Sequence, residues 1–194
     1  MESSIAKETI STLEREKFEG RIIVIQSLVE AKKATKFLSG YSIIGFDTET
    51  RPAYRKGSYY GVSLIQLSTE DTCFLFRLNI IGFPQCLIDL LSNPAVKKIG
   101  LSLKDDFASM NRRQPFSPNG FVDLQKIVQE YGITDTSLQK VYAILFHKKI
   151  SKNQRLTNWD ADILTDSQKK YAALDAWACL RIYNKLKMKN YLTK

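Results

Sequence analysis

The chain contains 194 residues, of which 44% are hydrophobic and 25% are charged, values that suit one folded domain rather than two. It has no run of about 18 apolar residues, which excludes a transmembrane helix. The first residues are polar and charged and hold no apolar stretch typical of a secretory signal. We therefore expect a cytoplasmic protein, or a nuclear one in a eukaryote.

The net charge is +9, because 29 lysines and arginines outnumber 20 aspartates and glutamates. A basic excess favours a polyanionic partner, and nucleic acid is the commonest one. The excess becomes informative if acidic residues gather where they would repel a phosphate, since that arrangement needs a metal ion between them. The three cysteines lie far apart, so neither a CxxC zinc pair nor an even disulfide framework is expected.

The elements predicted in chain order begin with a flexible leader over 1–20, followed by a single domain over 21–190. Short apolar runs predict strands at 21–25, 43–49, 61–68, 72–78 and 96–103. Helical periodicity predicts helices at 27–40, 84–91, 104–112, from 124 onward with breaks near 132 and across 147–160, and at 171–186. Capping boxes are expected at Ser27–Glu30, where the first helix opens, and at Thr165–Gln168, ahead of the last one. Strands first and helices around them indicate an α/β domain with a mixed central sheet.

Asp47 and Glu49 lie at the end of the apolar strand that begins at Ile43. Side chains alternate across a strand, so both carboxylates project in the same direction. Two carboxylates held close together disfavour joint ionisation unless a cation lies between them, and Mg²⁺ and Mn²⁺ prefer such oxygen ligands. A chance triplet is the alternative, because the same spacing recurs at Asp160 and Asp162, which we interpret as part of a solvated loop.

Tyr171 and Asp175 lie four residues apart in the final helix and therefore share one face. The same face holds Leu174 and Ala178, which suggests that it turns toward the protein interior. An inward carboxylate needs a partner, because an unpaired buried charge is costly. A structural ion pair with a nearby lysine such as Lys169 is the alternative explanation.

Asp105 and Asp106 follow the predicted strand that ends at Leu103, and they stand where a helix begins. One aspartate at such a junction commonly caps the helix. The second is then available for another role, but the spacing alone does not decide which of the two it is.

Taken in order, these residues resemble the DEDD superfamily of 3′-5′ exonucleases, in the subclass with a tyrosine in the third motif. Ribonuclease D and the Werner-type exonuclease domain are similar. The three motifs are residues 46–49, 100–106 and 171–176, and the resemblance extends over 22–186. The match falls on Asp106, and the adjacent Asp105 is the alternative. The only histidine, His147, is not in the third motif, so we expect it to be a surface residue.

The resemblance implies a ribonuclease H-like fold, with a mixed central β-sheet flanked by helices, and a metal-dependent 3′-5′ exonuclease. It implies two divalent ions, Mg²⁺ or Mn²⁺, held by Asp47, Glu49, Asp106 and Asp175, and a water molecule positioned by Tyr171. The expected substrate is DNA or RNA with a 3′ end, and the expected products are 5′-mononucleotides. No membrane partner is expected.

Two basic segments are candidates for nucleic-acid contacts. The first interleaves charge with aromatic rings, a mixture that can contact phosphates and stack on bases. The second precedes the third motif. An ordinary loop explains the first segment equally well, and a solvated face explains the second equally well. The candidate residues are Arg51, Tyr54, Arg55, Lys56, Tyr59, Lys148, Lys149 and Arg155.

A second hypothesis is a catalytically silent nucleic-acid-binding module with the same fold. Such a module is expected to have lost one or more of the acidic residues, whereas all five motif positions are present here. The acidic set therefore favours an active nuclease.

Overall fold

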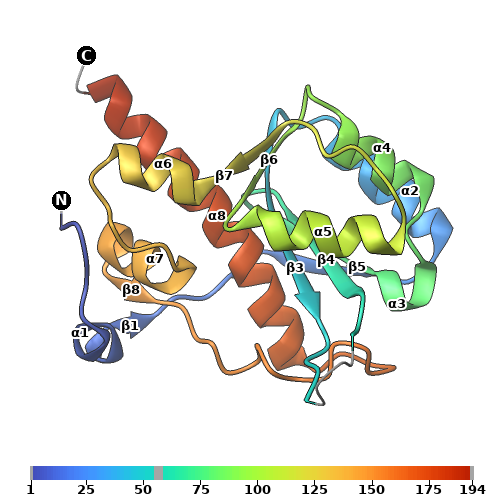
Figure 1. The fold of residues 1–194 in the computed structure, drawn as a ribbon, viewed down its shortest axis with the longest axis horizontal. Coiled ribbons are helices and arrows are strands. Elements are labelled where there is room, and N and C mark those ends of the chain that lie inside the picture. Colours follow the sequence, from blue (N-terminus) through green and yellow to red (C-terminus); the bar gives the residue numbers. More distant parts are fainter. Residues whose placement is uncertain (1, 55–58, 193–194) are drawn as a thin grey trace.

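The protein is built around one mixed six-stranded sheet (Figure 1). The computed structural model describes residues 2–54 and 59–192. The strands of the sheet are β2 (Arg21–Ile25), β3 (Ile43–Thr50), β4 (Val62–Ser68), β5 (Thr72–Arg77), β6 (Lys97–Gly100) and β7 (Phe121–Asp123). Their order is β2-β5-β4-β3-β6-β7. The β4 strand is antiparallel to β3 and β5, and the other neighbours are parallel, so the predicted mixed sheet is confirmed.

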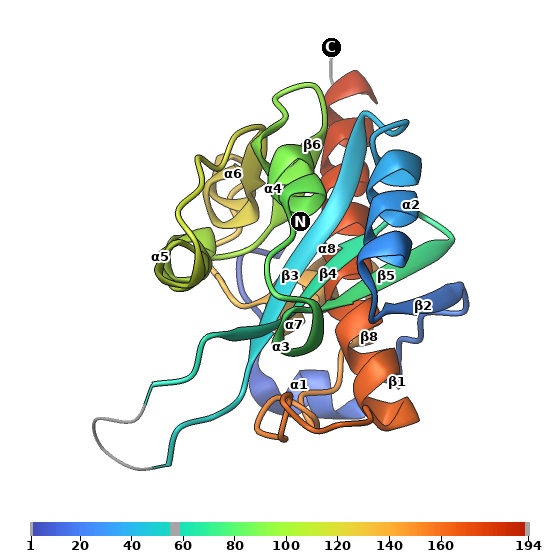
Figure 2. The same cartoon turned by 90° about the vertical axis from the view of Figure 1, so that its right-hand side faces the viewer.

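Helices cover both faces of the sheet. The longest, α8 (Asp166–Leu192), packs across β3 and β4 on one face (Figure 1). The opposite face carries α2 (Leu28–Leu38) and α4 (Gln85–Ser92) (Figure 2). The remaining helices are α1 (Lys7–Thr12), α3 (Leu78–Ile81), α5 (Leu103–Arg113), α6 (Leu124–Glu130) and α7 (Leu138–Phe146). In the part of the chain that the structure describes, every helix is too short or too polar to span a bilayer.

The sheet separates two hydrophobic cores, and β4 contributes to both. All seven residues of β4 are buried, as expected for a strand with helices on both faces. Leu64 belongs to the core beneath α7 and α8, whereas Ile65 and Leu67 belong to the core beneath α2 and α4. This alternation follows from the twofold side-chain period of a strand.

Local sequence signals set several element boundaries as predicted. Ser27 caps α2, and its reciprocal hydrogen bonds with Glu30 form the capping box expected there. Before α8, the backbone N–H of Thr165 donates to the side chain of Gln168 at 3.0 Å, and the Gln168 N–H donates back to the Thr165 hydroxyl at 3.2 Å. Both helix starts were predicted from these pairs.

The strand predicted over 96–103 is wrong in its second half. The β6 strand ends at Gly100, and Leu103 already begins α5. Ser102, with φ of 63°, makes the turn between them, and the Asp123 carboxylate accepts the backbone N–H groups of Ser102 and Leu103 at 3.0 and 3.1 Å. The β7 strand, which has only three residues, was not predicted.

Residues 2–20, part of the segment that we expected to form a flexible leader, lie against the domain. Their strand β1 (Glu14–Arg15) pairs with β8 (Lys148–Lys149) in a second, two-stranded sheet. Ile5, Ile10 and Phe18 are buried in the core beneath α8. Widely spaced apolar side chains in a polar segment give a weak sequence signal, but they are enough to attach the segment to the domain.

Candidate active site

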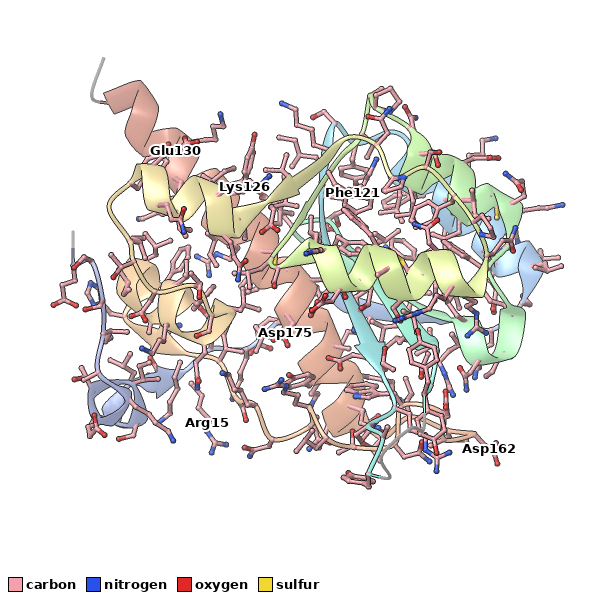
Figure 3. The ribbon with its side chains drawn as sticks, in the orientation of Figure 1. Arg15, Phe121, Lys126, Glu130, Asp162 and Asp175 are labelled. Carbon is pink, nitrogen blue, oxygen red and sulfur yellow. The ribbon has the colours of Figure 1, made fainter. Side chains whose placement is uncertain are left out.

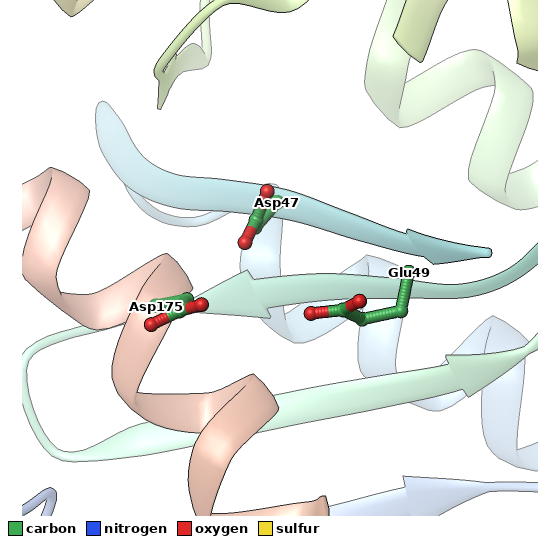
Figure 4. A group of neighbouring side chains, drawn as sticks. All are labelled: Asp47, Glu49 and Asp175. Atoms are coloured by element: carbon green, nitrogen blue, oxygen red, sulfur yellow. The ribbon is translucent and has the colours of Figure 1, made fainter. Parts of the chain in front are cut away.

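Strand β3 presents two carboxylates toward α8. Asp47 and Glu49 lie on the same face of the strand, and both point toward Asp175 (Figure 4). Glu49 is only 8% exposed, and Asp47 is half-buried. The shared direction predicted from the strand period is therefore present in the structure.

Helix α8 brings the third carboxylate and the tyrosine to the same place. Asp175 is 7% exposed, and its Oδ1 atom has no hydrogen-bond partner among the described residues. Tyr171 lies one turn earlier on the same face and lines the same cavity. The ring of Trp159, which is fully buried, lies 6.1 Å from the Tyr171 ring and packs beside it.

Gly45 sets the distance between the strand and the helix. A Cβ atom at this position would lie 2.0 Å from the carbonyl oxygen of Ala176, a contact that neither backbone can relieve without moving. Gly45 is two residues before Asp47, and Ala176 directly follows Asp175. The absence of a side chain at Gly45 therefore lets the two carboxylates approach each other.

The three carboxylates form a group of like charges. Asp47, Glu49 and Asp175 each offer an oxygen atom that lies within 4.8 Å of the other two. Burial, followed by the charge of Asp47, raises the pKa of Glu49 to about 10. Burial raises the pKa of Asp175 to about 7, and burial with the charges of Asp175 and Asp106 raises the pKa of Asp47. A buried unpaired oxygen and three converging carboxylates fit a divalent cation, which prefers oxygen ligands.

Asp106, rather than Asp105, faces this group. The hydroxyl of Thr48, the residue between Asp47 and Glu49 in the sequence, donates a hydrogen bond to Oδ1 of Asp106. Burial raises the pKa of Asp106 to about 6, and its charge in turn raises the pKa of both Asp47 and Glu49. Asp105 is exposed. The group of carboxylates that lie within 4.8 Å of one another does not include Asp106.

A cavity of about 320 Å³ opens onto the carboxylates. Arg155 and Lys152 line it, and both are exposed. The charge of Arg155 partly offsets the rise in the pKa of Glu49, and the charge of Lys152 partly offsets the rise in the pKa of Asp175. Both cations therefore act on the acidic group. Of the six candidates for nucleic-acid contacts that the structure describes, Arg155 is the one that lines the cavity at the carboxylates.

The other described candidates do not line this cavity. Arg51 stacks over the Tyr60 ring at 4.7 Å, and the Tyr54 hydroxyl donates to the Leu156 carbonyl at 3.0 Å. The Tyr59 ring, which is 55% exposed, lies 4.3 Å from the guanidinium of Arg112. Arg51, Tyr54 and Tyr59 belong to the segment that connects β3 to β4. Arg55 and Lys56 lie outside the described residues.

Lys148 and Lys149 form β8 and are engaged by the N-terminal segment. Lys148 pairs with Glu16 at 3.2 Å, and Lys149 donates to the carbonyl of Ser11. Neither lysine lines the cavity at the carboxylates. His147 is exposed and ends α7 in the left-handed region, with φ of 53°, as a surface residue.

Comparison with known proteins gives the family. A family model described as 3′-5′ exonuclease matches residues 22–190. The chain belongs to the 3′-5′ exonuclease family. The bifunctional 3′-5′ exonuclease/ATP-dependent helicase WRN of Mus musculus is 36% identical over 155 residues, which cover 77% of this chain but 11% of the relative. Ribonuclease D of Haemophilus influenzae is 31% identical over 146 residues, covering 74% of this chain and 36% of the relative.

The fold of this exonuclease family member is shared with a solved domain. The EXO domain of Aedes aegypti Nibbler superposes with a TM-score of 0.84 at 20% identity, covering 92% of this chain and 94% of that domain. The resemblance and the ribonuclease H-like fold expected from the sequence are therefore confirmed. The chain spans only part of the length of the two relatives above.

Two residues that position the site of this exonuclease domain were missed in the sequence. Gly45 interrupts an otherwise apolar strand, and a glycine in a strand interior signals a close backbone approach. Thr48 stands between the two acids of the first motif, and no role was predicted for its side chain. Its hydrogen bond to Asp106 joins residues 58 positions apart, so the sequence gives no local signal for it.

Proposed function

We propose that this domain is a metal-dependent 3′-5′ exonuclease that hydrolyses phosphodiester bonds at nucleic-acid 3′ ends and releases 5′-mononucleotides. The observation that carries the proposal is the group of three buried or half-buried carboxylates, with oxygen atoms within 4.8 Å of one another, at the mouth of a cation-lined cavity. Carboxylates at this spacing repel one another, and a divalent cation bound between them removes that repulsion. The anionic phosphodiester then binds to the cation and to the basic side chains.

In the proposed site, Asp47, Glu49, Asp106 and Asp175 hold two divalent ions, Mg²⁺ or Mn²⁺. Bound ions of this kind activate water and stabilise the charge that develops on the leaving oxygen. Lys152 and Arg155 line the same cavity, where they bind and orient the substrate phosphates.

Tyr171 acts by positioning rather than by accepting a proton. Burial and the charge of Asp175 raise the pKa of Tyr171 above its usual range, so the hydroxyl stays protonated at neutral pH. A protonated hydroxyl orients the attacking water through a hydrogen bond. Tyr171→Phe is therefore expected to slow hydrolysis by about a hundredfold, while divalent ions still bind.

The proposal is tested with DNA and RNA oligonucleotides labelled at either end, incubated with Mg²⁺, Mn²⁺ or a chelator. A 5′ label is expected to appear on progressively shorter strands, and a 3′ label to leave at once as a mononucleotide. Both changes require the divalent ion. Binding without shortening of any strand would contradict the proposal and support a silent binding module.

Matched aspartate variants localise the activity. Asp47→Ala or Asp175→Ala is expected to abolish shortening, because each removes a ligand from the carboxylate group. Asp105→Ala removes the same charge from an exposed position and is expected to retain most of the activity. Equal losses in all three variants would contradict the assignment of these residues.

A further inference from the structure

A second cavity adjoins the candidate active site. It has a volume of about 430 Å³ and lies between the N-terminal segment and the start of α8. Tyr171 and Ser151 line both cavities, so the two are neighbours that share a wall. Asp175 on α8 lines the cavity of the candidate active site, and Arg15 on β1 lines the second cavity; both residues are labelled in Figure 3.

The N-terminal wall of this second cavity is held rigidly. Glu16 accepts a hydrogen bond from the Tyr142 hydroxyl at 2.7 Å and pairs with Lys148 at 3.2 Å and Arg181 at 3.3 Å. Phe18 is buried, and its ring packs edge-on against that of Trp177 at 5.6 Å. The segment is therefore fixed by alternate residues that point inward.

The residues on either side of Glu16 point outward and are charged. Arg15 and Lys17 flank Glu16, are exposed, and line the cavity, as the side-chain alternation of an extended segment requires. Lys170, exposed on the first turns of α8, lines it from the other side. Among the described residues, none of these three cations has an ion-pair partner.

The charge balance of the cavity favours an anion. Its wall holds two carboxylates, Glu16 and Glu19. The Glu16 carboxylate is already engaged by its own cations, so three free cations face one carboxylate.

We propose that this second cavity binds the phosphodiester backbone of the substrate strand, beyond the nucleotide at the carboxylates, through Arg15 and Lys170. The inference rests on the proposed exonuclease function. A strand that enters past Tyr171 and Ser151 meets the carboxylates in one cavity and the unpaired cations in the next. The N-terminal segment thereby makes the domain select longer strands over very short ones.

The test compares wild type with the double variant Arg15→Gln/Lys170→Gln on a single strand of about twelve nucleotides and on a dinucleotide. Loss of two phosphate contacts is expected to weaken binding of the longer strand about tenfold. It should also reduce the slope of log Kd against log salt by about 1.4, or about 0.7 per contact. The ratio of kcat/KM between long strand and dinucleotide is expected to fall about tenfold.

The control variant Lys32→Gln/Lys36→Gln removes the same charge from exposed positions on α2, across the sheet, and is expected to behave as wild type. An unchanged salt slope, or equal losses on both lengths, would overturn the inference. Because binding is measured in chelator by fluorescence anisotropy, it reports on the second cavity even if no strand is cleaved. The absence of exonuclease activity is thus distinguished from the absence of strand binding at the second cavity.

Discussion

The carboxyl groups of Asp47, Glu49 and Asp175 oppose the folding of the domain when no cation is present. Each is brought out of water and toward the other two, and nothing among the described residues neutralises Oδ1 of Asp175. Asp175→Asn removes one charge while keeping the shape of the side chain. We expect it to raise the free energy of unfolding of the metal-free domain by about 1–3 kcal/mol, measured by urea denaturation. A destabilised variant would contradict the account.

The same carboxyl groups predict how stability depends on pH. The folded-state pKa values of about 6 for Asp106, about 7 for Asp175 and about 10 for Glu49 lie above the ordinary values of these groups. Stability that comes from the protonated forms is complete below about pH 4 and is lost as the pH rises through these values.

The melting temperature of the metal-free domain should therefore fall between about pH 5 and pH 8. The increase in melting temperature on adding Mn²⁺ should be larger at the higher pH, because the ligands are then deprotonated. A thermal-shift series in chelator and in Mn²⁺ measures both. An Mn²⁺ effect that shrinks as the pH rises would contradict the assignment.

Single residues also show where sequence reasoning stops. The shared direction of Asp47 and Glu49 follows from strand geometry, and that of Tyr171 and Asp175 from helix geometry, and both are seen in the structure. The choice of Asp106 over Asp105 rested on resemblance. In the structure, Asp106 accepts a hydrogen bond from Thr48, a tertiary contact without a local sequence signal, whereas Asp105 is exposed.

At the scale of elements, the site depends on how closely α8 packs on β3. The backbone of Ala176 occupies the space that a side chain at Gly45 would need. Gly45→Ala is expected to push the helix away, to cost about 2–4 kcal/mol in unfolding free energy, and to reduce Mn²⁺ affinity. Urea denaturation and Mn²⁺ titration measure the two effects.

Gly40→Ala is the control for this variant, because a Cβ atom there would meet only the Phe37 carbonyl oxygen, at 3.3 Å. A Gly45→Ala protein with wild-type stability and wild-type Mn²⁺ affinity would show that the close approach is not required.

Element boundaries were predictable where a side chain caps the end of a helix. The capping boxes at Ser27 and Thr165 begin their helices as expected. The end of β6 was not predictable, because the turn at Ser102 depends on hydrogen bonds to Asp123, which is 21 residues away. The three-residue strand β7 is too short and too mixed in polarity to give a period.

At the scale of the whole molecule, the N-terminal segment joins parts of the chain that are distant in sequence. It pairs with β8, contacts α7 and α8 through Glu16, and buries Phe18. Phe18→Ala is expected to lower the free energy of unfolding by about 3 kcal/mol, because it leaves a cavity against Trp177. Phe37→Ala, at a position 43% exposed, is the matched control with a smaller loss. Equal stability of both variants in urea would contradict this role for the segment.

The proposed activity of the domain depends on whether the carboxylates bind divalent ions. Equilibrium binding of Mn²⁺ in the presence of a 5′-mononucleotide, followed by electron paramagnetic resonance of the free ion, tests this most directly. We expect two bound ions per chain for the wild type and for Asp105→Asn, and weak or absent binding for Asp47→Asn. Binding by Asp47→Asn that equals the wild type, or no binding by the wild type, would contradict it.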